Sequence, residues 1–296
     1  MKFGQVDNAE NIDFSIPKDH PKTKEILQEA DKNRPLTFYV GCAKWNKTDL
    51  KNFYPRGTKD ELAYYATQFN SIELNATFYN MYDATQITNW YNKTPDHFRF
   101  FPKVNQMISH MKRLINIDTL LEEYCDNISH FDKKLGMVFL QLHNNFTYKN
   151  FDRLQHFIEI FPKALPLGIE LRNTEWFTDV KISEEVFSFF ENHGVTNILV
   201  DTAGRRDMMH MRFTSPFAFI RYVGANDPEG DRERLDNWVK RIESWVNDGL
   251  RDIYFFVHQN VEVESPLLLA HFIDKLNSTF GLKLQVPTVT FVLTKK

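Results

Sequence analysis

Ser71-Ile72-Glu73-Leu74-Asn75-Ala76-Thr77-Phe78-Tyr79 is a stretch in which apolar residues first alternate with a carboxylate and an amide. Successive side chains of a β-strand point to opposite faces, so Ile72 and Leu74 belong to one face and Glu73 and Asn75 to the other. An acidic side chain on the inner face of a strand is costly for structure, because burying a charge carries a penalty, and useful for chemistry. The stretch therefore predicts a buried strand that ends at a functional site.

The same pattern occurs a second time at Gly168-Ile169-Glu170-Leu171-Arg172-Asn173. Ile169 and Leu171 would share one face of a strand, and Glu170 and Arg172 would share the other. The two stretches fall on the second and fifth predicted strands, which is not the spacing of two duplicated half-barrels. We interpret the two stretches as strands whose equivalent positions need the same kinds of side chain, rather than as an internal repeat.

Strands and helices alternate on both sides of these stretches. Strands are predicted at 37–42, 71–75, 98–103, 136–143, 167–171, 197–201, 217–223 and 252–258. Helices are predicted at 59–69, 85–91, within 117–131, and at 151–161, 183–192, 232–246 and 266–276. Only the sixth unit lacks a clear helix, because residues 204–215 form a basic, methionine-bearing loop.

Eight consecutive strand–helix units favour an α/β fold of the (β/α)8 TIM-barrel type, in a single domain, over an open doubly wound sheet. The open sheet remains an alternative, because periodicity alone does not show closure. No glycine-rich dinucleotide-binding loop follows an early strand, which counts against that alternative. We expect residues 1–35 to be an N-terminal extension, 36–280 the barrel domain and 281–296 a C-terminal tail.

The composition indicates a folded protein without a strong overall charge. The 296 residues include 27 phenylalanines, which predicts an aromatic-rich core, and the net charge of −3 does not by itself predict nucleic-acid binding. The two cysteines, Cys42 and Cys125, form no disulfide framework and no metal-ligand spacing, which suits a reducing compartment. We see no membrane span and no signal-peptide core, and expect a soluble, cytoplasmic protein with no membrane partner.

A series of further motifs follows along the chain. They are Gly41-Cys42-Ala43-x-Trp45, Phe53-Tyr54-Pro55, Leu62-x-x-Tyr65-Ala66-x-x-Phe69, Glu73-Leu74-Asn75-x-Thr77-Phe78-Tyr79, Trp90, Pro95-x-x-Phe98-x-Phe100-x-x-Lys103, Ser109-His110, Gln141-Leu142, Glu170-Leu171-Arg172, Trp176-Phe177 and Asp201. In this order they resemble the YecE-like family of TIM barrels, which is described as a domain of unknown function. The resemblance runs from about Thr37 to Leu276; it implies the barrel fold and no particular reaction.

The chain departs from the family pattern in its second half. The family tends to have a histidine where this chain has Asn173, and Arg-x-His-Gly where it has Arg221-Tyr222-Val223-Gly224. A pair of asparagines is replaced by His258-Gln259, and Gln-Leu-Pro is replaced by Gln141-Leu142-His143. We therefore expect this half of the pocket to differ from that of the relatives.

In a TIM barrel, side chains at the carboxyl ends of the strands line the active site. By strand parity, the catalytic candidates there are Glu73, Glu170, Lys103 and His258. The candidates for substrate binding are Asn75, Gln141, Arg172, Asp201, Arg221, Trp45, Tyr79, Trp176 and His110. The three aromatic residues follow strands one, two and five, where they could form a stacking wall for a sugar or a base.

The predicted site contains equal numbers of acidic and basic side chains. The acids are Glu73, Glu170 and Asp201, and the bases are Lys103, Arg172 and Arg221. A balanced set most simply forms a paired, hydrogen-bonded network. A divalent-metal site needs an excess of carboxylates and histidines, so we expect no metal and no cofactor. Arginines instead favour a small-molecule ligand with carboxylate, phosphate or hydroxyl groups.

Structural roles compete with each of these assignments. The two glutamates could be plain ion-pair partners, since such networks also occur inside barrels. Asn75 could cap a loop, and His258 could be a satisfied polar residue at a strand end. A lone aromatic residue belongs to the core more often than to a binding wall.

Three functions are compatible with this pattern. The first, which we favour, is a metal-independent enzyme that uses general acid–base catalysis on a small polar or anionic substrate, such as a sugar, phosphate or carboxylate compound. Glu73 or Glu170 would be its base, and the reaction could be that of a hydrolase, a lyase or an isomerase. The second is a divalent-metal phosphodiesterase or sugar isomerase. The third is a non-catalytic nucleic-acid-binding barrel whose Arg205-Arg206 loop contacts phosphates.

Overall fold

The strand–helix alternation of the sequence is present in the structure. The computed structural model describes residues 4–6 and 8–289, and its strands occupy the predicted positions to within two residues, apart from the strand predicted at 197–201. The strands are β1 (Thr37–Cys42), β2 (Ser71–Leu74), β3 (Arg99–Pro102), β4 (Val138–Gln141), β5 (Leu167–Glu170), β6 (Thr196–Asn197), β7 (Leu199–Thr202), β8 (Phe217–Val223) and β9 (Asp252–His258).

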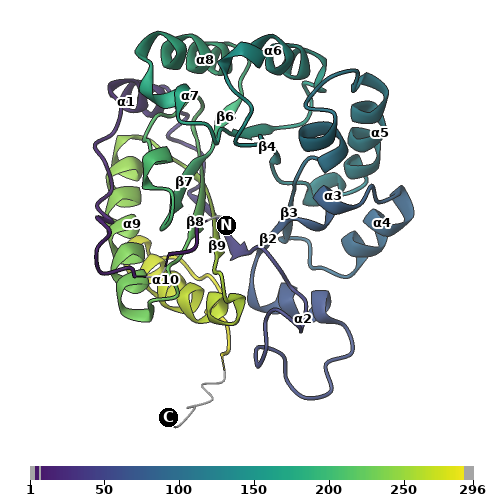
Figure 1. Ribbon diagram of the computed structural model, residues 1–296. Helices are drawn as coiled ribbons and strands as arrows, with labels where there is room; N and C mark the ends of the chain where they lie inside the picture. Colours follow the sequence, from purple (N-terminus) through teal and green to yellow (C-terminus); the bar gives the residue numbers. More distant parts are fainter. Residues whose placement is uncertain (1–3, 7, 290–296) are drawn as a thin grey trace.

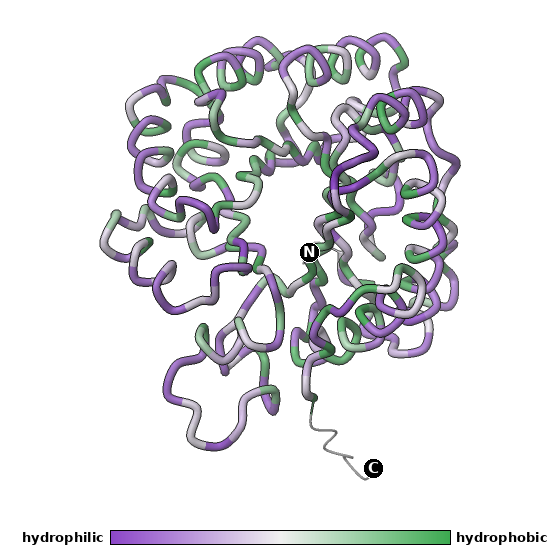
Figure 2. Tube along the Cα trace, turned by 180° about the vertical axis from the view of Figure 1, so that it is seen from behind, coloured by the Kyte–Doolittle hydropathy of each residue, from purple (hydrophilic) through white to green (hydrophobic). Residues whose placement is uncertain are grey.

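Helices follow the strands and lie outside them (Figure 1). They are α1 (Pro21–Gln28), α2 (Glu61–Gln68), α3 (Ala76–Tyr79), α4 (Ala84–Asn92), α5 (Asp118–Ser129), α6 (Phe151–Ile160), α7 (Glu175–Thr178), α8 (Val180–Asn192), α9 (Pro228–Asp248) and α10 (Ser265–Phe280). Hydrophobic and hydrophilic residues alternate along the outer helices (Figure 2), as expected for helices that bury one face. Among the described residues, no helix has the length and apolar character needed to span a membrane.

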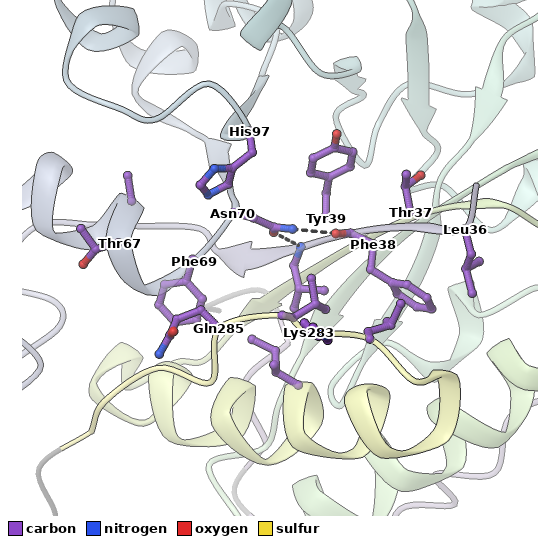
Figure 3. Close-up of a pocket in the computed structure, with 15 residues that line it drawn as sticks. Leu36, Thr37, Phe38, Tyr39, Thr67, Phe69, Asn70, His97, Lys283 and Gln285 are labelled. Atoms are coloured by element: carbon purple, nitrogen blue, oxygen red, sulfur yellow. Dashed lines mark hydrogen bonds between the residues drawn. The ribbon is translucent and has the colours of Figure 1, made fainter. Parts of the chain in front are cut away.

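Hydrogen bonding groups the described strands into three parallel sheets, with the orders β1-β9-β8-β7, β2-β3 and β4-β5-β6. Single bridges from Phe100 to Leu135 and from Lys103 to Phe139 connect β3 with the β4 segment. Between β1 and β2 the side chain of Asn70 replaces the ladder: it accepts from the Val40 amide at 2.9 Å and donates to the Phe38 carbonyl at 2.7 Å (Figure 3). The structure is thus a single mixed α/β domain with parallel sheets.

Two hydrophobic clusters make up the core. The larger lies between the strands and the helices, and the smaller lies among the side chains on the inner faces of the strands. The inner cluster consists of Phe101, Met137, Phe139, Ile198, Val200, Met208, Phe219 and Phe256. Its rings pack edge to face, as between Phe101 and Phe256 at 4.8 Å, and they form an apolar layer below the carboxyl ends of the strands.

The predicted strand at 197–201 is wrong as a continuous element. It is divided into β6 and β7 at Ile198, and Ile198 and Val200 point into the inner cluster. Since side chains alternate along a strand, Asp201 points outward, toward the helices. The absence of a regular helix after this strand was predicted correctly, because residues 204–215 contain only the 3-10 turn η4 (Arg206–Met208).

The predicted N-terminal extension packs closely against the rest of the domain. Asp19 accepts from Arg241 at 2.6 Å and from Trp245 at 2.9 Å, and Leu27 of α1 is buried. Gly4 has a φ of +81°, and a Cβ there would lie 2.8 Å from the Thr202 hydroxyl, so this segment rests on the end of β7. Residues 1–3 and 7 of the predicted extension, and residues 290–296 of the predicted tail, lie outside the described residues.

Candidate functional site

Two buried glutamates share one arginine at the carboxyl ends of β2, β5 and β8. Arg221 donates from Nε to Glu73 Oε2 and from Nη2 to Glu73 Oε1, both at 2.8 Å, and from Nη1 to Glu170 Oε2. Glu73 and Glu170 are both 0% exposed. The alternating pattern of β2 and β5 explains this placement, because it directs each carboxylate inward while Ile72 and Ile169 face the helices.

Further polar side chains extend this ionic network on both sides. On the Glu170 side, Arg172 Nε donates to Oε1 at 2.6 Å and Gln141 Nε2 donates to the same oxygen at 2.9 Å. On the Glu73 side, Asn75 Nδ2 lies 2.9 Å and His258 Nε2 lies 3.0 Å from Oε1. These residues were all candidates from the sequence, and the structure brings them into one connected cluster.

The network keeps both carboxylates ionised. Burial raises the pKa of Glu73, but Arg221 and His258 outweigh this effect and hold the pKa well below its usual range. Burial acts in the same way on Glu170, and Arg221 with Arg172 lowers its pKa to about 2. Burial would lower the pKa of Arg221, but the two carboxylates raise it above its ordinary value. Glu73 and Glu170 are therefore weak bases that hold the arginines in place.

Lys103, directly after β3, is a basic member of the cluster whose amine is not ion-paired with Glu73 or Glu170. Its side chain is buried, and its Nζ donates to Gln141 Oε1 at 2.8 Å and lies 4.1 Å from the centre of the Phe78 ring. Burial, with Arg221 and Arg172, lowers the pKa of Lys103 to about 7, against the opposing effect of Glu170 and Glu73. The Lys103 amine is therefore poised to exchange a proton near neutral pH.

A cavity of about 420 Å³ opens on Glu73 at the ends of β1 and β2. Its lining consists of Ala43, Lys44, Trp45, Asn46, Asp49, Glu73, Leu74, Asn75, Ala76 and Tyr79. We call this space the Glu73 cavity. Trp45 is half-buried against Trp90, whereas Tyr79 is 65% exposed. Two of the predicted rim aromatics thus flank a cavity whose floor is part of the ionic network.

A second cavity, of about 440 Å³, lies elsewhere, at the seam between β1 and β2 (Figure 3). Its walls come from β1, α2, α10 and residues 282–285, and include Phe38, Phe69 and Ile273. No member of the ionic network lines it. Of these two cavities, the Glu73 cavity is the one that contacts the ionic network.

The family follows from comparison of the whole chain with known proteins. A family model described as "Protein of unknown function DUF72" matches residues 39–289. The chain belongs to the DUF72 family. The predicted resemblance is confirmed, and the description of the DUF72 family names no function.

Relatives of this DUF72 chain occur among bacterial proteins. The UPF0759 protein YecE of Escherichia coli (strain K12) is 25% identical over 262 residues, covering 81% of this chain and 93% of YecE. The UPF0759 protein YunF of Bacillus subtilis (strain 168) is 26% identical over 259 residues, covering 75% and 88%. A crystal structure of a DUF72 family protein from Enterococcus faecalis V583 matches with a TM-score of 0.66 and 16% identity, over 84% of this chain and 99% of that one. At that identity the match shows the shared fold alone.

Two sequence candidates of the DUF72 chain lie outside the cluster. Asp201 accepts from Arg206, from Arg234 at 2.7 Å and from Trp238 at 2.7 Å on the helix side of β7, so its predicted place in the mouth is wrong. Trp176 is fully buried and donates to the Phe146 carbonyl at 2.9 Å, so it belongs to the core and not to a rim wall.

His110 lies at the edge of the cluster, in a π-helical turn, η1 (Met107–Met111). Its ring stands edge-on to Phe78 at 4.9 Å, and its Nδ1 lies 2.9 Å from the Ser109 hydroxyl. Burial, followed by the charge of Lys103, lowers the pKa of His110 to about 4. The imidazole is therefore neutral at neutral pH and is available as a hydrogen-bonding group beside Lys103.

Sequence reasoning missed several residues around the site. Phe78, which covers the amine of Lys103, belongs to the opening nonapeptide but follows its strand, on α3, where parity gives no direction. Lys44, Asn46 and Asp49 come from the segment between β1 and α2, and Lys44 pairs with Asp49 at 3.2 Å. Only the position of this segment after a strand end could have indicated them.

The donor set does not resemble an open metal site. Within residues 4–6 and 8–289, no three His, Cys, Asp or Glu side chains are grouped so as to hold a metal ion. Glu73 and Glu170 direct their oxygens at guanidinium groups, which a metal ion would have to displace.

The lowered pKa of Lys103 predicts a specific dependence of stability on pH. Between pH 7 and 10.5 the unfolded chain holds the Lys103 proton that the folded chain has lost, so folding becomes more favourable as pH rises through this range. We expect the wild type to gain roughly 2–3 kcal/mol of unfolding free energy relative to Lys103→Met between pH 6.5 and pH 9.5. Urea unfolding of both proteins at the two pH values measures this difference. An unchanged difference would show that Lys103 keeps its ordinary pKa.

Proposed function

We propose that this DUF72 protein is a metal-independent enzyme that binds a small polar or anionic substrate in the Glu73 cavity and acts on it by proton transfer. The observation that supports this most strongly is that the arginines and the lysine of the cluster have different partners. Arg221 and Arg172 engage Glu73 and Glu170, and Lys103 is left as a buried amine that titrates near neutral pH.

This proposal changes the roles first expected for the charged residues. Glu73 and Glu170 were the candidates for the base, yet two strong partners each hold them ionised, which makes them positioning residues. Arg221 was a candidate for binding an anion, yet its N–H groups are directed at the two glutamates. Its Nη2 also lies 3.1 Å from His258 Nε2. Lys103 does not line the Glu73 cavity, but it is connected to Glu73 through Gln141, Glu170 and Arg221. In this proposal Lys103 supplies the acid or base, with the neutral His110 beside it.

The lining of the Glu73 cavity supports a polyhydroxylated or anionic substrate. Asn75 and Glu73 present an amide and a carboxylate at its floor, and Lys44 presents a cation at its wall. Trp45 and Tyr79 provide aromatic surface on which the apolar face of a sugar can pack. A cavity of this size accepts a small molecule rather than a polymer, which favours the enzyme over the nucleic-acid-binding alternative.

We also propose that the three sheets form one closed (β/α)8 barrel. In support, the inner cluster fills a space enclosed by strands from all three sheets, the helices lie outside, and Asn70 bridges the seam between β1 and β2. In this proposal residues 36–280 are the barrel domain, 1–35 an extension and 281–296 a tail. The buried free thiols of Cys42 and Cys125 suit the expected cytoplasmic location.

Removing the exposed aromatic wall tests the proposed site. We expect ribose 5-phosphate or citrate to raise the melting temperature of the wild type, and Tyr79→Ala to weaken that binding about tenfold, because one stacking contact contributes on the order of 1 kcal/mol. Tyr79 is largely exposed, so the melting temperature without ligand should not change. Calorimetric titration of both proteins measures the affinities.

Val180→Ala provides the control, since Val180 is 75% exposed and lies on α8, away from the cavity. It should bind both probes as the wild type does. If neither probe binds the wild type, or if Tyr79→Ala binds them equally well, the Glu73 cavity is not the site for this class of substrate.

A further inference from the structure

Lys103 is held rigidly by its backbone at the end of β3. Its amide donates to the Leu74 carbonyl at 3.2 Å, its carbonyl accepts from the Thr77 hydroxyl at 2.8 Å, and it forms a bridge with Phe139 of β4. The side chain is 7% exposed. The amine is therefore directed to one position among the polar groups of the cluster.

The hydrogen-bond partner of this amine can be satisfied by either the charged or the uncharged form. Among residues 4–6 and 8–289, no carboxylate lies within ion-pair distance of Lys103 Nζ, and its one side-chain acceptor is the neutral Gln141. Gln141 uses its own amide to donate to Glu170 at 2.9 Å, which fixes its oxygen toward Lys103. An uncharged amine can still donate one hydrogen to that oxygen while keeping a lone pair.

Lys134 shows the contrasting arrangement in the same chain. It is also buried, at 2% exposure, but its Nζ donates to the Tyr91 carbonyl at 2.7 Å and to the Thr94 carbonyl at 2.6 Å. Its Nζ also lies 3.4 Å from the Thr94 hydroxyl. Three oxygen partners occupy three ammonium hydrogens, so Lys134 has no lone pair to offer.

We propose that Lys103 is a nucleophile that forms a covalent iminium with the carbonyl carbon of a small aldehyde or ketone. This inference rests on the proposed function and names its substrate class. Lys103 lies outside the lining of the Glu73 cavity, so the carbonyl group of the substrate has to extend beyond that lining to reach Nζ. It follows from a fixed, buried amine with one neutral acceptor, adjacent to arginines that are anchored by the two glutamates.

The proposed step balances without an external oxidant or reductant. The Nζ lone pair forms a C–N bond as the C=O π pair moves to oxygen, and proton transfer from nitrogen to oxygen gives a carbinolamine. The carbinolamine oxygen then takes one proton from solvent and its C–O bond breaks, so one water molecule leaves and the nitrogen lone pair forms the C=N bond of the cationic iminium. Hydrolysis reverses the sequence and returns the free amine.

The charges around Lys103 favour the unprotonated amine, which is the form that attacks, and they come from several elements. Arg221 of β8 and Arg172 after β5 disfavour the ammonium form, and burial acts in the same direction. Glu170 of β5 and Glu73 of β2 oppose them, and the neutral His110 of η1 faces the amine. The balance lowers the pKa of Lys103 to about 7, so a large share of the amine is unprotonated at pH 7.5.

Reductive trapping tests the proposal on the wild-type protein. We expect dihydroxyacetone or pyruvate, each with sodium cyanoborohydride at pH 7.5, to leave a stable secondary amine on Lys103, found by mass spectrometry of the digested protein. Lys134 should remain unmodified in the same sample. Absence of an adduct on Lys103 with both probes, or equal modification of Lys103, Lys134 and exposed lysines such as Lys133, overturns the proposal.

A conservative variant separates the nucleophile from a structural role. Gln141→Glu places a carboxylate 2.8 Å from Nζ, which should hold Lys103 protonated. It also replaces the amide that donates to Glu170 at 2.9 Å, so thermal unfolding of the variant is measured beside the trapping. We expect trapping at pH 7.5 to slow at least tenfold and to recover at higher pH. Trapping at the wild-type rate in Gln141→Glu contradicts the proposal.

The outcome distinguishes this inference from the function on which it rests. Tyr79-dependent binding of ribose 5-phosphate or citrate without any adduct on Lys103 overturns the iminium and leaves the acid–base proposal in place. An adduct on Lys103 that forms although neither of those probes binds supports the iminium and removes sugar phosphates and polycarboxylates as substrates.

Discussion

Arg221→Met is expected to destabilise the protein by about 3–5 kcal/mol, because removing one partner of a buried ion pair leaves an uncompensated charge. Arg221 is 4% exposed and makes three hydrogen bonds to Glu73 and Glu170, which are fully buried. Arg172 would remain as a partner of Glu170, and His258 as a partner of Glu73. For a chain of this size the loss corresponds to a fall of about 5–8 °C in melting temperature.

Thermal and urea unfolding of Arg221→Met measure this effect, with Lys133→Met as the control. Lys133 pairs with Asp96 at 3.1 Å on the surface, where both side chains are more than half exposed, so its loss should change stability little. Adding Glu73→Gln and Glu170→Gln to Arg221→Met should restore part of the stability, since it removes the unpaired charges. A change of less than about 1 kcal/mol in Arg221→Met would show that the buried network is not formed.

Asp201→Ala is expected to have a comparable effect on stability and none on the site. Asp201 is 1% exposed and holds the buried Arg234 at 2.7 Å and the indole of Trp238 at 2.7 Å. Its removal should destabilise the protein by about 3–5 kcal/mol, because among the residues that the structure describes Arg234 keeps only Asp231, at 2.9 Å, as an ion-pair partner. Asp201→Asn should lose less, since the amide oxygen still accepts.

Stability and binding must be measured on the same preparation of this variant. Calorimetric titration at a temperature where Asp201→Ala is folded should give the wild-type affinity for ribose 5-phosphate or citrate, whichever binds the wild type. A variant that keeps its stability and loses binding would contradict the outward orientation of Asp201 and return it to the mouth of the site.

The strands and the floor of the site could be predicted because they depend on local alternation. In β2 and β5 a period of two residues is enough to assign Glu73 and Glu170 to the inner face. The two strands lie in different sheets, and Arg221 of β8 connects the two carboxylates. The same rule correctly selected Gln141, Arg221 and His258, which the structure connects through hydrogen bonds.

Asp201 could not be placed in this way, because long-range contacts interrupt its strand. The Asn197 amide bonds to the Thr214 hydroxyl, and its side chain donates to the Arg212 carbonyl, which ends β6 after two residues. The ladder resumes in β7 with Val200 facing inward. A local pattern cannot report this change, because its cause lies about fifteen residues away in the chain.

The rim aromatics show a second limit of prediction from the sequence, which concerns the orientation of side chains after a strand. Trp45, Tyr79 and Trp176 each follow a strand, but the path of the chain after that strand decides where the ring points. Trp176 turns back to the Phe146 carbonyl and is buried, whereas Tyr79, at the end of α3, remains exposed beside the cavity. The place of an aromatic residue shortly after a strand therefore did not determine the orientation of its ring.

The protonation of Lys103 can be observed directly. The protein labelled with ¹³C at the ε carbon of lysine gives one resonance that is lost in Lys103→Arg, and its chemical shift can be followed from pH 5.5 to pH 10. A midpoint near pH 7 is the expected result, with the exposed lysines titrating above pH 10. If the Lys103 signal titrates together with the exposed lysines, the amine is an ordinary ammonium group at neutral pH, and neither proton transfer nor iminium formation can be assigned to it.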